Sequence, residues 1–202
     1  MKVVVATRNR GKLRELVPLL AGSGLELVTI DELAPDAELR EDEVTFEGNA
    51  LAKARQAAAA TGLPALADDS GLEVDALGGA PGVFSARYAG VGATDEANNA
   101  KLIEALRGVP EARRTCRYRC VAAFVDPTRG IEMWRAGACE GRVTEAPRGD
   151  GGFGYDPYFL VVERAQTMAE IPLDEKNHLS HRAVAFRALG VALASVIARP
   201  KA

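Results

Sequence analysis

The sequence predicts an α/β protein: a mixed β-sheet with flanking helices, divided into two lobes around a central cleft. The apolar segment Val3 to Ala6 indicates a buried strand, and Lys12 to Leu20 follows with apolar residues on one helical face. A second helix, Phe46 to Thr61, leads into the apolar segment Leu63 to Ala67. Because strands and helices alternate along the chain, we expect helices to cover the sheet.

The ends of two helices carry recognisable capping residues. Thr45 is the expected N-cap of the second helix, and Gly62 is its expected C-terminal stop. Thr94 precedes two acidic residues and should begin a third helix that ends near Gly108 and Pro110.

The second half of the chain predicts a long hairpin and a closing helix. Polar and apolar residues partly alternate from Arg113 to Val125, and a turn leads to a second strand from Ile131 to Ala138. A further strand is expected from Tyr158 to Val162. The Ala- and Val-rich segment His181 to Arg199 predicts a last helix, with Ser180 as its cap.

Length and composition favour a single domain, residues 1–202, made of two lobes. The chain has 202 residues, of which 48% are hydrophobic, and a net charge of -3. This balance implies no general attraction to nucleic acid or to an anionic membrane. Three cysteines without CxxC spacing indicate a reducing compartment, and no apolar run approaches the about 20 residues of a membrane span. With a strand at the very start in place of a signal peptide, we expect a soluble cytoplasmic protein.

Two adjacent carboxylates, Asp68 and Asp69, follow the apolar segment and precede Ser70 and Gly71. We interpret them as an acidic turn at a strand end. One reading is a metal site, because adjacent buried carboxylates need a compensating cation or donor. Upstream Glu41 would fit that reading, since Mg²⁺ is held by few carboxylates plus substrate oxygens. The other reading is a solvated turn of common turn-forming residues.

A basic segment between the first strand and the first helix is a candidate phosphate site. Backbone N–H groups, the helix dipole and cationic side chains would face an anion there. It is not a P-loop, because the residue after Gly11-Lys12 is Leu13. A solvated basic helix start is the alternative. Lys53 on the second helix would either project from an apolar flank toward a cleft or lie at the surface. The segment consists of Thr7, Arg8, Asn9, Arg10, Gly11 and Lys12.

Two groups of residues near the C-terminal end are candidates for binding a nucleobase. In a Gly-rich loop, the ring of Phe153 would stack on a base, although a core aromatic in a hairpin loop is the alternative. Arg182 and His181 offer donors for a keto oxygen, whereas a zinc site at His178 and His181 lacks a third ligand. The alternative to base binding is that these cationic side chains form a solvated cluster at a helix start. The full set is Phe153, Gly154, Tyr155, Asp156, Lys176, His178, His181 and Arg182.

These segments resemble, in order and over nearly the whole chain, the Ham1-like family of inosine/xanthosine triphosphate pyrophosphatases. The resemblance rests on six blocks. They are Ala6 to Lys12, Thr45 to Ala50 with Lys53, Ala67 to Leu72, Gly78 to Gly82 with Ser85 to Tyr88, Gly151 to Pro157, and Glu175-Lys176 with Ser180 to Arg182. Gly48 departs from the pattern, since many members carry Glu there.

The resemblance implies an elongated two-lobed fold and a homodimer. It also implies Mg²⁺-dependent hydrolysis of ITP, dITP or XTP to the monophosphate and pyrophosphate, which would keep deaminated purines out of DNA and RNA. Asp69 would be the general base and a metal ligand, helped by Asp68 and Glu41. Substrate contacts would come from Thr7 to Lys12, Lys53, Ser70, Phe153 to Asp156, Lys176, His181 and Arg182, with Arg87 as a further phosphate contact.

Three questions stay open at the level of sequence. The division of metal and base duties between Asp68 and Asp69 is one, and the basis of GTP rejection is another, because guanine also carries a 6-keto oxygen. The third is the class of protein: a nucleotide sensor would keep the pocket without turnover. An aspartyl-phosphate phosphatase would use Asp69 as a nucleophile rather than as a base.

Overall fold

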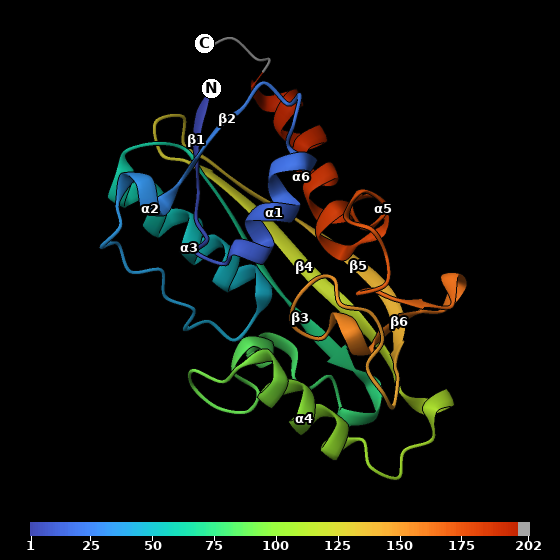
Figure 1. Ribbon diagram of the computed structural model, residues 1–202. Coiled ribbons are helices and arrows are strands. Elements are labelled where there is room, and N and C mark those ends of the chain that lie inside the picture. Colours follow the sequence, from blue (N-terminus) through green and yellow to red (C-terminus); the bar gives the residue numbers. More distant parts are fainter. Residues whose placement is uncertain (198–202) are drawn as a thin grey trace. The chain divides into compact units, whose positions relative to one another are not determined.

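The computed structural model describes residues 1–197 and contains a seven-stranded sheet with the strand order β2-β1-β3-β4-β5-β6-β7 (Figure 1). The strands are β1 (Lys2–Val5), β2 (Glu26–Thr29), β3 (Ala65–Val74), β4 (Thr115–Asp126), β5 (Ile131–Val143), β6 (Phe159–Val161) and β7 (Gln166–Thr167). The helices are α1 (Arg10–Leu19), α2 (Ile30–Leu33), α3 (Phe46–Thr61), α4 (Asp95–Ala105), α5 (Leu173–Leu179) and α6 (His181–Ile197). The predicted mixed sheet with flanking helices is confirmed.

The chain divides into two compact units. The first unit comprises Met1–Asp69, Cys120–Gly137 and the chain from Arg182 onward. The second unit comprises Ser70–Arg119 and Ala138–His181. Each unit has its own hydrophobic core.

The first unit is built on β1, which pairs in parallel with both β2 and β3. Val3 and Val5 share a buried cluster with Leu16 of α1 and Phe186 of α6. Successive side chains of a strand point to opposite faces, so Val4 points away from that cluster. Helix α3 packs against β1, and its Ala-rich buried side accounts for the second layer. Figure 1 shows α3 on one side of these strands and α1 and α6 on the other.

The ends of α3 follow the predicted capping residues. The side-chain oxygen of Thr45 accepts a hydrogen bond from the backbone N–H of Gly48 at 3.0 Å. Gly62 ends the helix with φ of 68°, a left-handed conformation that favours glycine. A Cβ on Gly48 would lie 2.8 Å from Cβ of Glu43. The absence of a side chain at position 48 therefore lets the preceding loop pack against the helix start.

The second unit has a core in which strand side chains meet α4. Leu72 of β3, Leu102 of α4, Tyr118 of β4 and Phe159 of β6 belong to one buried cluster. Tyr118 and Phe159 stack with ring centroids 4.4 Å apart. Helix α4 begins after Thr94, whose hydroxyl accepts from the backbone N–H of Ala97. The predicted start of this helix is confirmed.

Several predicted boundaries are corrected. The most important is the acidic turn: Asp68 and Asp69 lie inside β3, which continues to Val74. Pairing with neighbouring strands outweighs the turn-forming tendency of Asp, Ser and Gly. Helix α1 begins two residues earlier than expected, because Asn9 caps it, and α4 ends at Ala105, before Gly108.

Other differences concern the second half of the chain. The hairpin of β4 and β5 is present, with β5 extending to Val143, and the strand expected from Tyr158 is reduced to β6. Helix α5 was not indicated by the sequence, and it ends with Ser180 as its C-terminal cap. Ser180 also directly precedes α6, so its predicted role as the cap of the last helix stays a prediction. The expected extension of the last helix to Arg199 lies outside the described residues.

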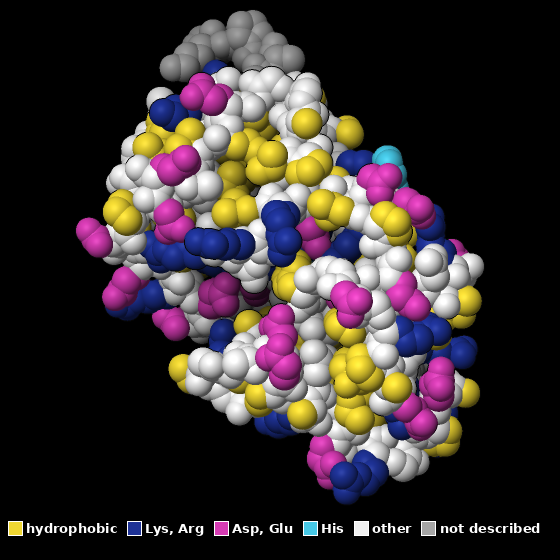
Figure 2. Space-filling model, in the orientation of Figure 1, with side chains coloured by type: hydrophobic (Ala, Val, Ile, Leu, Met, Phe, Trp, Pro, Cys, Tyr) yellow, Lys and Arg dark blue, Asp and Glu magenta, His cyan; other side chains and the backbone are white. Residues whose placement is uncertain are grey.

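Within residues 1–197, no single helix is long and apolar enough to cross a membrane, although the bent pair α5 and α6 together meets that test by length and composition. The face of the molecule in Figure 2 carries Lys, Arg, Asp and Glu side chains interspersed with small apolar patches. This mixture agrees with the small net charge of -3.

Candidate active site

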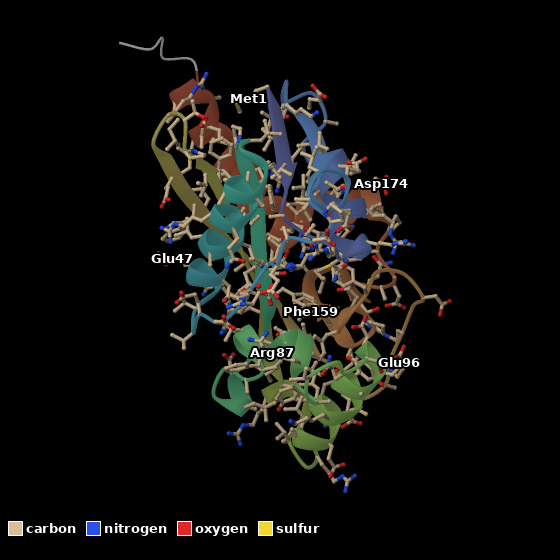
Figure 3. The ribbon with its side chains drawn as sticks, turned by 90° about the vertical axis from the view of Figure 1, so that its left-hand side faces the viewer. Met1, Glu47, Arg87, Glu96, Phe159 and Asp174 are labelled. Atoms are coloured by element: carbon tan, nitrogen blue, oxygen red, sulfur yellow. The ribbon has the colours of Figure 1, made fainter. Side chains whose placement is uncertain are left out.

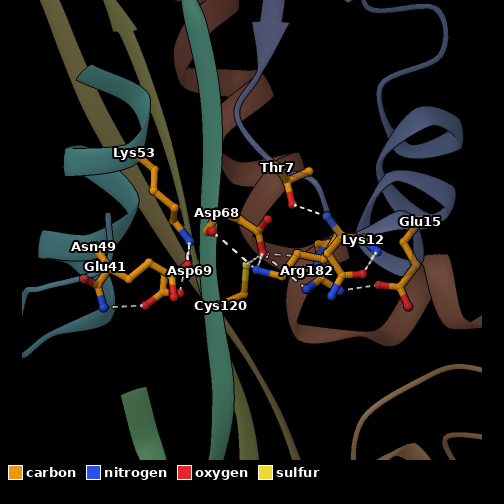
Figure 4. Close-up of polar contacts among 11 residues, drawn as sticks. Thr7, Lys12, Glu15, Glu41, Asn49, Lys53, Asp68, Asp69, Cys120 and Arg182 are labelled. Atoms are coloured by element: carbon orange, nitrogen blue, oxygen red, sulfur yellow. Dashed lines mark hydrogen bonds and ion pairs between the residues drawn. The ribbon is translucent and has the colours of Figure 1, made fainter. Parts of the chain in front are cut away.

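Asp68 and Asp69 lie on opposite faces of β3 (Figure 4). Leu66, two residues before Asp68, belongs to the cluster with α1 and α6. Asp68 therefore points toward α1 and α6, whereas Asp69 points toward α3. The two carboxylates are neighbours in sequence but have separate partners.

Asp68 is buried among cations of the first unit. Its Oδ2 lies 3.1 Å from Nζ of Lys12 and accepts from Nε and Nη2 of Arg182 at 3.3 and 3.2 Å. Its Oδ1 is buried and has no hydrogen-bond partner among the described residues. Burial alone would raise the pKa of Asp68, but the charges of Lys12, Arg182 and Lys53 lower it well below its usual range. The lowered pKa favours the ionised form of Asp68 at neutral pH.

Arg182 is also buried and binds a second carboxylate. Its Nη1 donates to Glu15 of α1, so one guanidinium joins α1, β3 and α6. Burial would lower the pKa of Arg182, but the charges of Asp68 and Glu15 raise it above its ordinary value. The guanidinium thus has a structural ion-pair role in addition to the base-reading role that the sequence suggests.

Asp69 is held on the other face by α3. Its Oδ2 accepts from Nδ2 of Asn49 at 3.0 Å, and its Oδ1 accepts from Nζ of Lys53 at 3.2 Å. Lys53 also donates to Glu41. Burial raises the pKa of Asp69, and the opposing charges of Lys53 and Lys12 only partly offset it. The pKa of Lys53 is raised, because the charges of Asp69 and Glu41 outweigh the effect of burial.

The pKa values of the two aspartates are therefore shifted in opposite directions. A carboxylate with a raised pKa is the better proton acceptor, and one with a lowered pKa is better suited to a fixed charge. This contrast favours Asp69 over Asp68 as a general base.

The residues fit a divalent cation only if substrate oxygens complete its coordination. No group of three His, Cys, Asp or Glu side chains able to hold a metal ion occurs in the described part of the chain. Asp69 and Glu41 nevertheless converge on Nζ of Lys53, and the Glu41 side chain is 31% exposed. Mg²⁺ is typically bound by one or two carboxylates plus phosphates. The pair Asp69 and Glu41 meets that requirement, whereas Asp68 faces the other side of β3.

The basic segment before α1 is partly occupied by internal contacts. Oδ1 of Asn9 accepts from the backbone N–H of Lys12 and so caps the helix. Oγ1 of Thr7 accepts from the backbone N–H of Asn9. Arg8 donates through Nε to Asp31 at 2.7 Å. Its Nη2 donates to two backbone carbonyl oxygens in the loop that follows α2. Arg10 is exposed in the first turn of α1.

In the second unit, Asp156 organises the predicted base-binding residues. It accepts from the hydroxyl of Tyr118 at 3.0 Å, from Nζ of Lys176 at 2.6 Å and from the backbone N–H of Phe153 at 3.0 Å. Nζ of Lys176 lies 5.4 Å from the ring centroid of Phe153. His181 stacks on Tyr118 with centroids 4.6 Å apart. The hydrogen bonds of Asp156 link the loop to β4 and α5.

The predicted site residues thus fall into two sets. The first unit contains Thr7, Arg8, Asn9, Arg10, Gly11, Lys12, Glu41, Lys53, Asp68, Asp69 and Arg182. The second unit contains Ser70, Arg87, Phe153, Gly154, Tyr155, Asp156, Lys176 and His181. Within the first set, the structure brings Lys12 and Arg182 to Asp68, and Lys53 and Glu41 to Asp69.

Sequence reasoning missed three residues that hold these groups in place. Asn49 orients Asp69, Glu15 pairs with Arg182, and Tyr118 contacts both Asp156 and His181. Asn49 was detectable in part, because it lies one turn before Lys53 on the same helical face. No local signal marks Glu15 or Tyr118.

The sheet and site define a class of α/β protein in which one strand carries two buried carboxylates, one bound by a lysine of α3 and the other by cations of α1 and α6. Comparison with known proteins places the chain within this class. A sequence profile described as the Ham1 family matches residues 3–191. The chain therefore belongs to the Ham1 family, as the sequence predicts.

Individual relatives agree with this assignment. The chain is 53% identical to the dITP/XTP pyrophosphatase of Geobacter sulfurreducens, over 93% of this chain and 94% of the relative. It is 52% identical to the enzyme of the same name from Desulforamulus reducens, over 93% and 92%. The solved structure of a HAM1 protein from Coxiella burnetii superposes with a TM-score of 0.87 at 41% identity, covering 96% of this chain and 99% of that protein.

Proposed function

We propose that this protein hydrolyses the deaminated purine nucleotides ITP, dITP and XTP to the monophosphate and pyrophosphate. The observation that carries the proposal is the environment of Asp69, a buried carboxylate with a raised pKa that Asn49 orients and Lys53 contacts. The relatives named dITP/XTP pyrophosphatase support the choice of substrate.

The reaction requires a proton acceptor at the attacking water. The water oxygen forms a bond to the α-phosphorus, the bond from that phosphorus to the pyrophosphate oxygen breaks, and the water proton passes to Asp69. Asn49 donates to one oxygen of that carboxylate and Lys53 donates to the other, so the two hydrogen bonds fix the orientation of the group. Mg²⁺ held by Asp69 and Glu41 would supply charge neutralisation of the polyphosphate.

Phosphate binding is assigned to the segment Thr7 to Lys12 and to Lys53. The first turn of α1 begins at Arg10 and contributes the positive end of the helix dipole. Arg10 is exposed and adds a cation to the same turn. Arg8 is held by Asp31, so we propose that it acts mainly by shaping the segment. Arg87 is a further candidate for contacting phosphate.

Base binding is assigned to Phe153, Gly154, Tyr155 and Asp156 with Ser70, Lys176, His181 and Arg182. A base stacked on Phe153 would lie close to Lys176, whose ammonium group is already placed over that ring. A donor facing the 6-keto oxygen of hypoxanthine or xanthine would be mismatched with the 6-amino group of adenine, a penalty of about 1 to 3 kcal/mol. Rejection of GTP requires in addition a pocket that does not accommodate its 2-amino group.

The direct test is pyrophosphate release from ITP, dITP, XTP, GTP and ATP, each with Mg²⁺ and again with excess EDTA. We expect rapid release from the first three, slower release from GTP and ATP, and loss of release in EDTA. Binding of ITP without release would instead support a nucleotide sensor.

A second experiment separates water attack from a covalent intermediate. In oxygen-18 water, a single turnover should place the label directly in the monophosphate. Label that enters only after an acyl-phosphate on Asp69 has formed would support the nucleophile mechanism.

We also propose that the protein acts as a cytoplasmic homodimer, without binding nucleic acid or membranes, and thereby limits incorporation of deaminated purines into DNA and RNA. The dimer is tested by light scattering coupled to size-exclusion chromatography, where a mass near twice 21.4 kDa is expected.

A further inference from the structure

Helix α4 of the second unit holds the backbone of the loop Phe153 to Asp156 at one residue. The side chain of Asp95 accepts from the backbone N–H of Gly154 at 2.6 Å. Nδ2 of Asn99 donates to the carbonyl oxygen of the same glycine at 2.8 Å. Positions 95 and 99 are four apart, so both side chains project from the same helical face. Two side chains of α4 therefore form hydrogen bonds with the backbone N–H and the carbonyl oxygen of Gly154.

The adjacent residue of α4 holds a second loop. Oδ1 of Asn98 accepts from the backbone N–H of Ala89 at 2.8 Å, and its Nδ2 donates to the carbonyl oxygen of Ala86 at 3.2 Å. Arg87, a candidate phosphate contact, lies between these two alanines. Asn98 and Asn99 are 3% and 8% exposed, so both amides bind within the protein rather than in solvent.

We propose that Asp95 and Asn99 are positioning residues for nucleotide binding, which keep Phe153 in the orientation that stacks on the base. This inference rests on the proposed function, because it assigns a role to the loop in binding a purine nucleotide.

Three physical points support the assignment. First, Gly154 has φ of 63°, and because glycine has many accessible conformations, the hydrogen bonds on both of its polar groups select this one. Second, the backbone N–H of Gly154 already donates to Asp95, so that N–H positions the loop rather than donating to the base. Third, Asp156 and Lys176 fix the other end of the loop. With both ends held, Phe153 loses little conformational freedom when a base stacks on it.

The variants separate the two hydrogen bonds from general effects on α4. Asp95→Ala removes the acceptor for Gly154, whereas Asp95→Asn keeps an acceptor oxygen. Asn99→Asp has nearly the same shape but replaces the donor with an acceptor. Glu96→Ala is the matched control, because Glu96 is an exposed acid in the same helical turn whose hydrogen bonds stay within that turn (Figure 3).

We expect Asp95→Ala to raise KM for ITP about fivefold to tenfold with kcat within about twofold, the effect of losing one hydrogen bond that acts on binding. Asn99→Asp also places a buried carboxylate against the carbonyl oxygen of Gly154, so it should raise KM at least as much. Asp95→Asn should recover most of the loss, and Glu96→Ala should leave KM unchanged. Hydrogen exchange of residues 150–157 in the ligand-free protein should become faster in the first two variants only.

Two outcomes overturn the inference. In one, exchange in residues 150–157 is unchanged in Asp95→Ala and Asn99→Asp. In the other, exchange is faster but KM for ITP stays at the wild-type value, so the loop is held without serving binding. Failure of the proposed function is a different result: the unaltered protein would neither bind ITP nor release pyrophosphate, and exchange would still decide whether α4 holds the loop.

Discussion

Asp68 and Asp69 differ in what their partners do to their charge. Asp68 meets Lys12 and Arg182 deep in the first unit, so its negative charge is compensated by two cations. Asp69 shares Lys53 with Glu41 and receives its second hydrogen bond from the neutral amide of Asn49. A fixed anion on one face of β3 and a proton acceptor on the other follow from these partners.

The buried position of Arg182 predicts a large effect on stability. Arg182→Ala would leave Asp68 and Glu15 buried without their shared cation, so we expect the free energy of unfolding to fall by about 3 to 5 kcal/mol. Arg187→Ala is the matched control, because Arg187 is exposed on the same helix, so its removal leaves no buried charge and should cost less than about 1 kcal/mol. Urea unfolding measures both.

Equal losses in the two variants would contradict the ion-pair role of Arg182. The same measurement is needed before kinetics, since a reduced preference for ITP over ATP in Arg182→Ala reports on base recognition only if the variant is folded under the assay conditions.

The lowered pKa of Asp68 makes stability depend on pH in a defined direction. The folded pKa lies below the unfolded value of about 3.9, so the ionised group stabilises the fold above that value. The contribution is lost as pH falls through the folded pKa. We expect the difference in unfolding free energy between wild type and Asp68→Asn to be constant from pH 7 to about 5 and to shrink below about pH 4. A difference that grows on acidification would contradict this assignment.

At the scale of elements, strand β3 decides the geometry of the site. Its alternation sends Asp68 toward α1 and α6 and Asp69 toward α3, and one residue of register shift would exchange their environments. The parallel pairing of Val4 with Ala65 and of Val5 with Leu66 fixes that register. The strand, rather than a loop, therefore positions both carboxylates.

Helix α3 was predictable because its signals are local, whereas β3 was not fully predictable. Thr45 and Gly62 act within one turn of the chain, so the sequence alone defines both helix ends. Asp68 to Gly71 has the composition of a turn, and only pairing with distant strands keeps it extended. The short strands β2 and β7 have four and two residues, which is too few for a periodic pattern.

The candidate site, too, could be predicted from the sequence only where the signals are local. The segment before α1 and the residues around Asp69 could be found from residue type and spacing. The partners Glu15 and Asn99 could not, because their hydrogen bonds join residues 167 and 55 positions apart in the chain. Such contacts depend on how distant segments pack together in the folded chain.

The N-cap of α3 is expected to support the site as well as the helix. Thr45→Ala removes the acceptor for the N–H of Gly48 and should lower the unfolding free energy by about 1 kcal/mol. Thr45→Ser keeps a hydroxyl acceptor and should stay close to wild type. Thermal unfolding compares the two variants with wild type. If Thr45→Ala is as stable as Thr45→Ser, the hydroxyl cap contributes nothing to stability.

At the scale of the whole molecule, the proposed chemistry divides between the two units. The first unit contains the proton acceptor, the carboxylate of Glu41 and the basic segment before α1. The second unit contains Phe153, Lys176 and His181, with the loop held by α4. Binding and catalysis should therefore be separable by mutation, with substitutions in α4 acting on KM and substitutions at Asp69 acting on kcat.

The most direct test of the central claim is pyrophosphate release from Mg²⁺-ITP by wild type and by Asp69→Asn, with ITP affinity measured in parallel by calorimetry. Because a positioned general base contributes at least about a hundredfold, we expect kcat to fall by that factor or more while the Kd for ITP changes less than about tenfold. Turnover of the variant near the wild-type rate would contradict the assignment of Asp69 as the base.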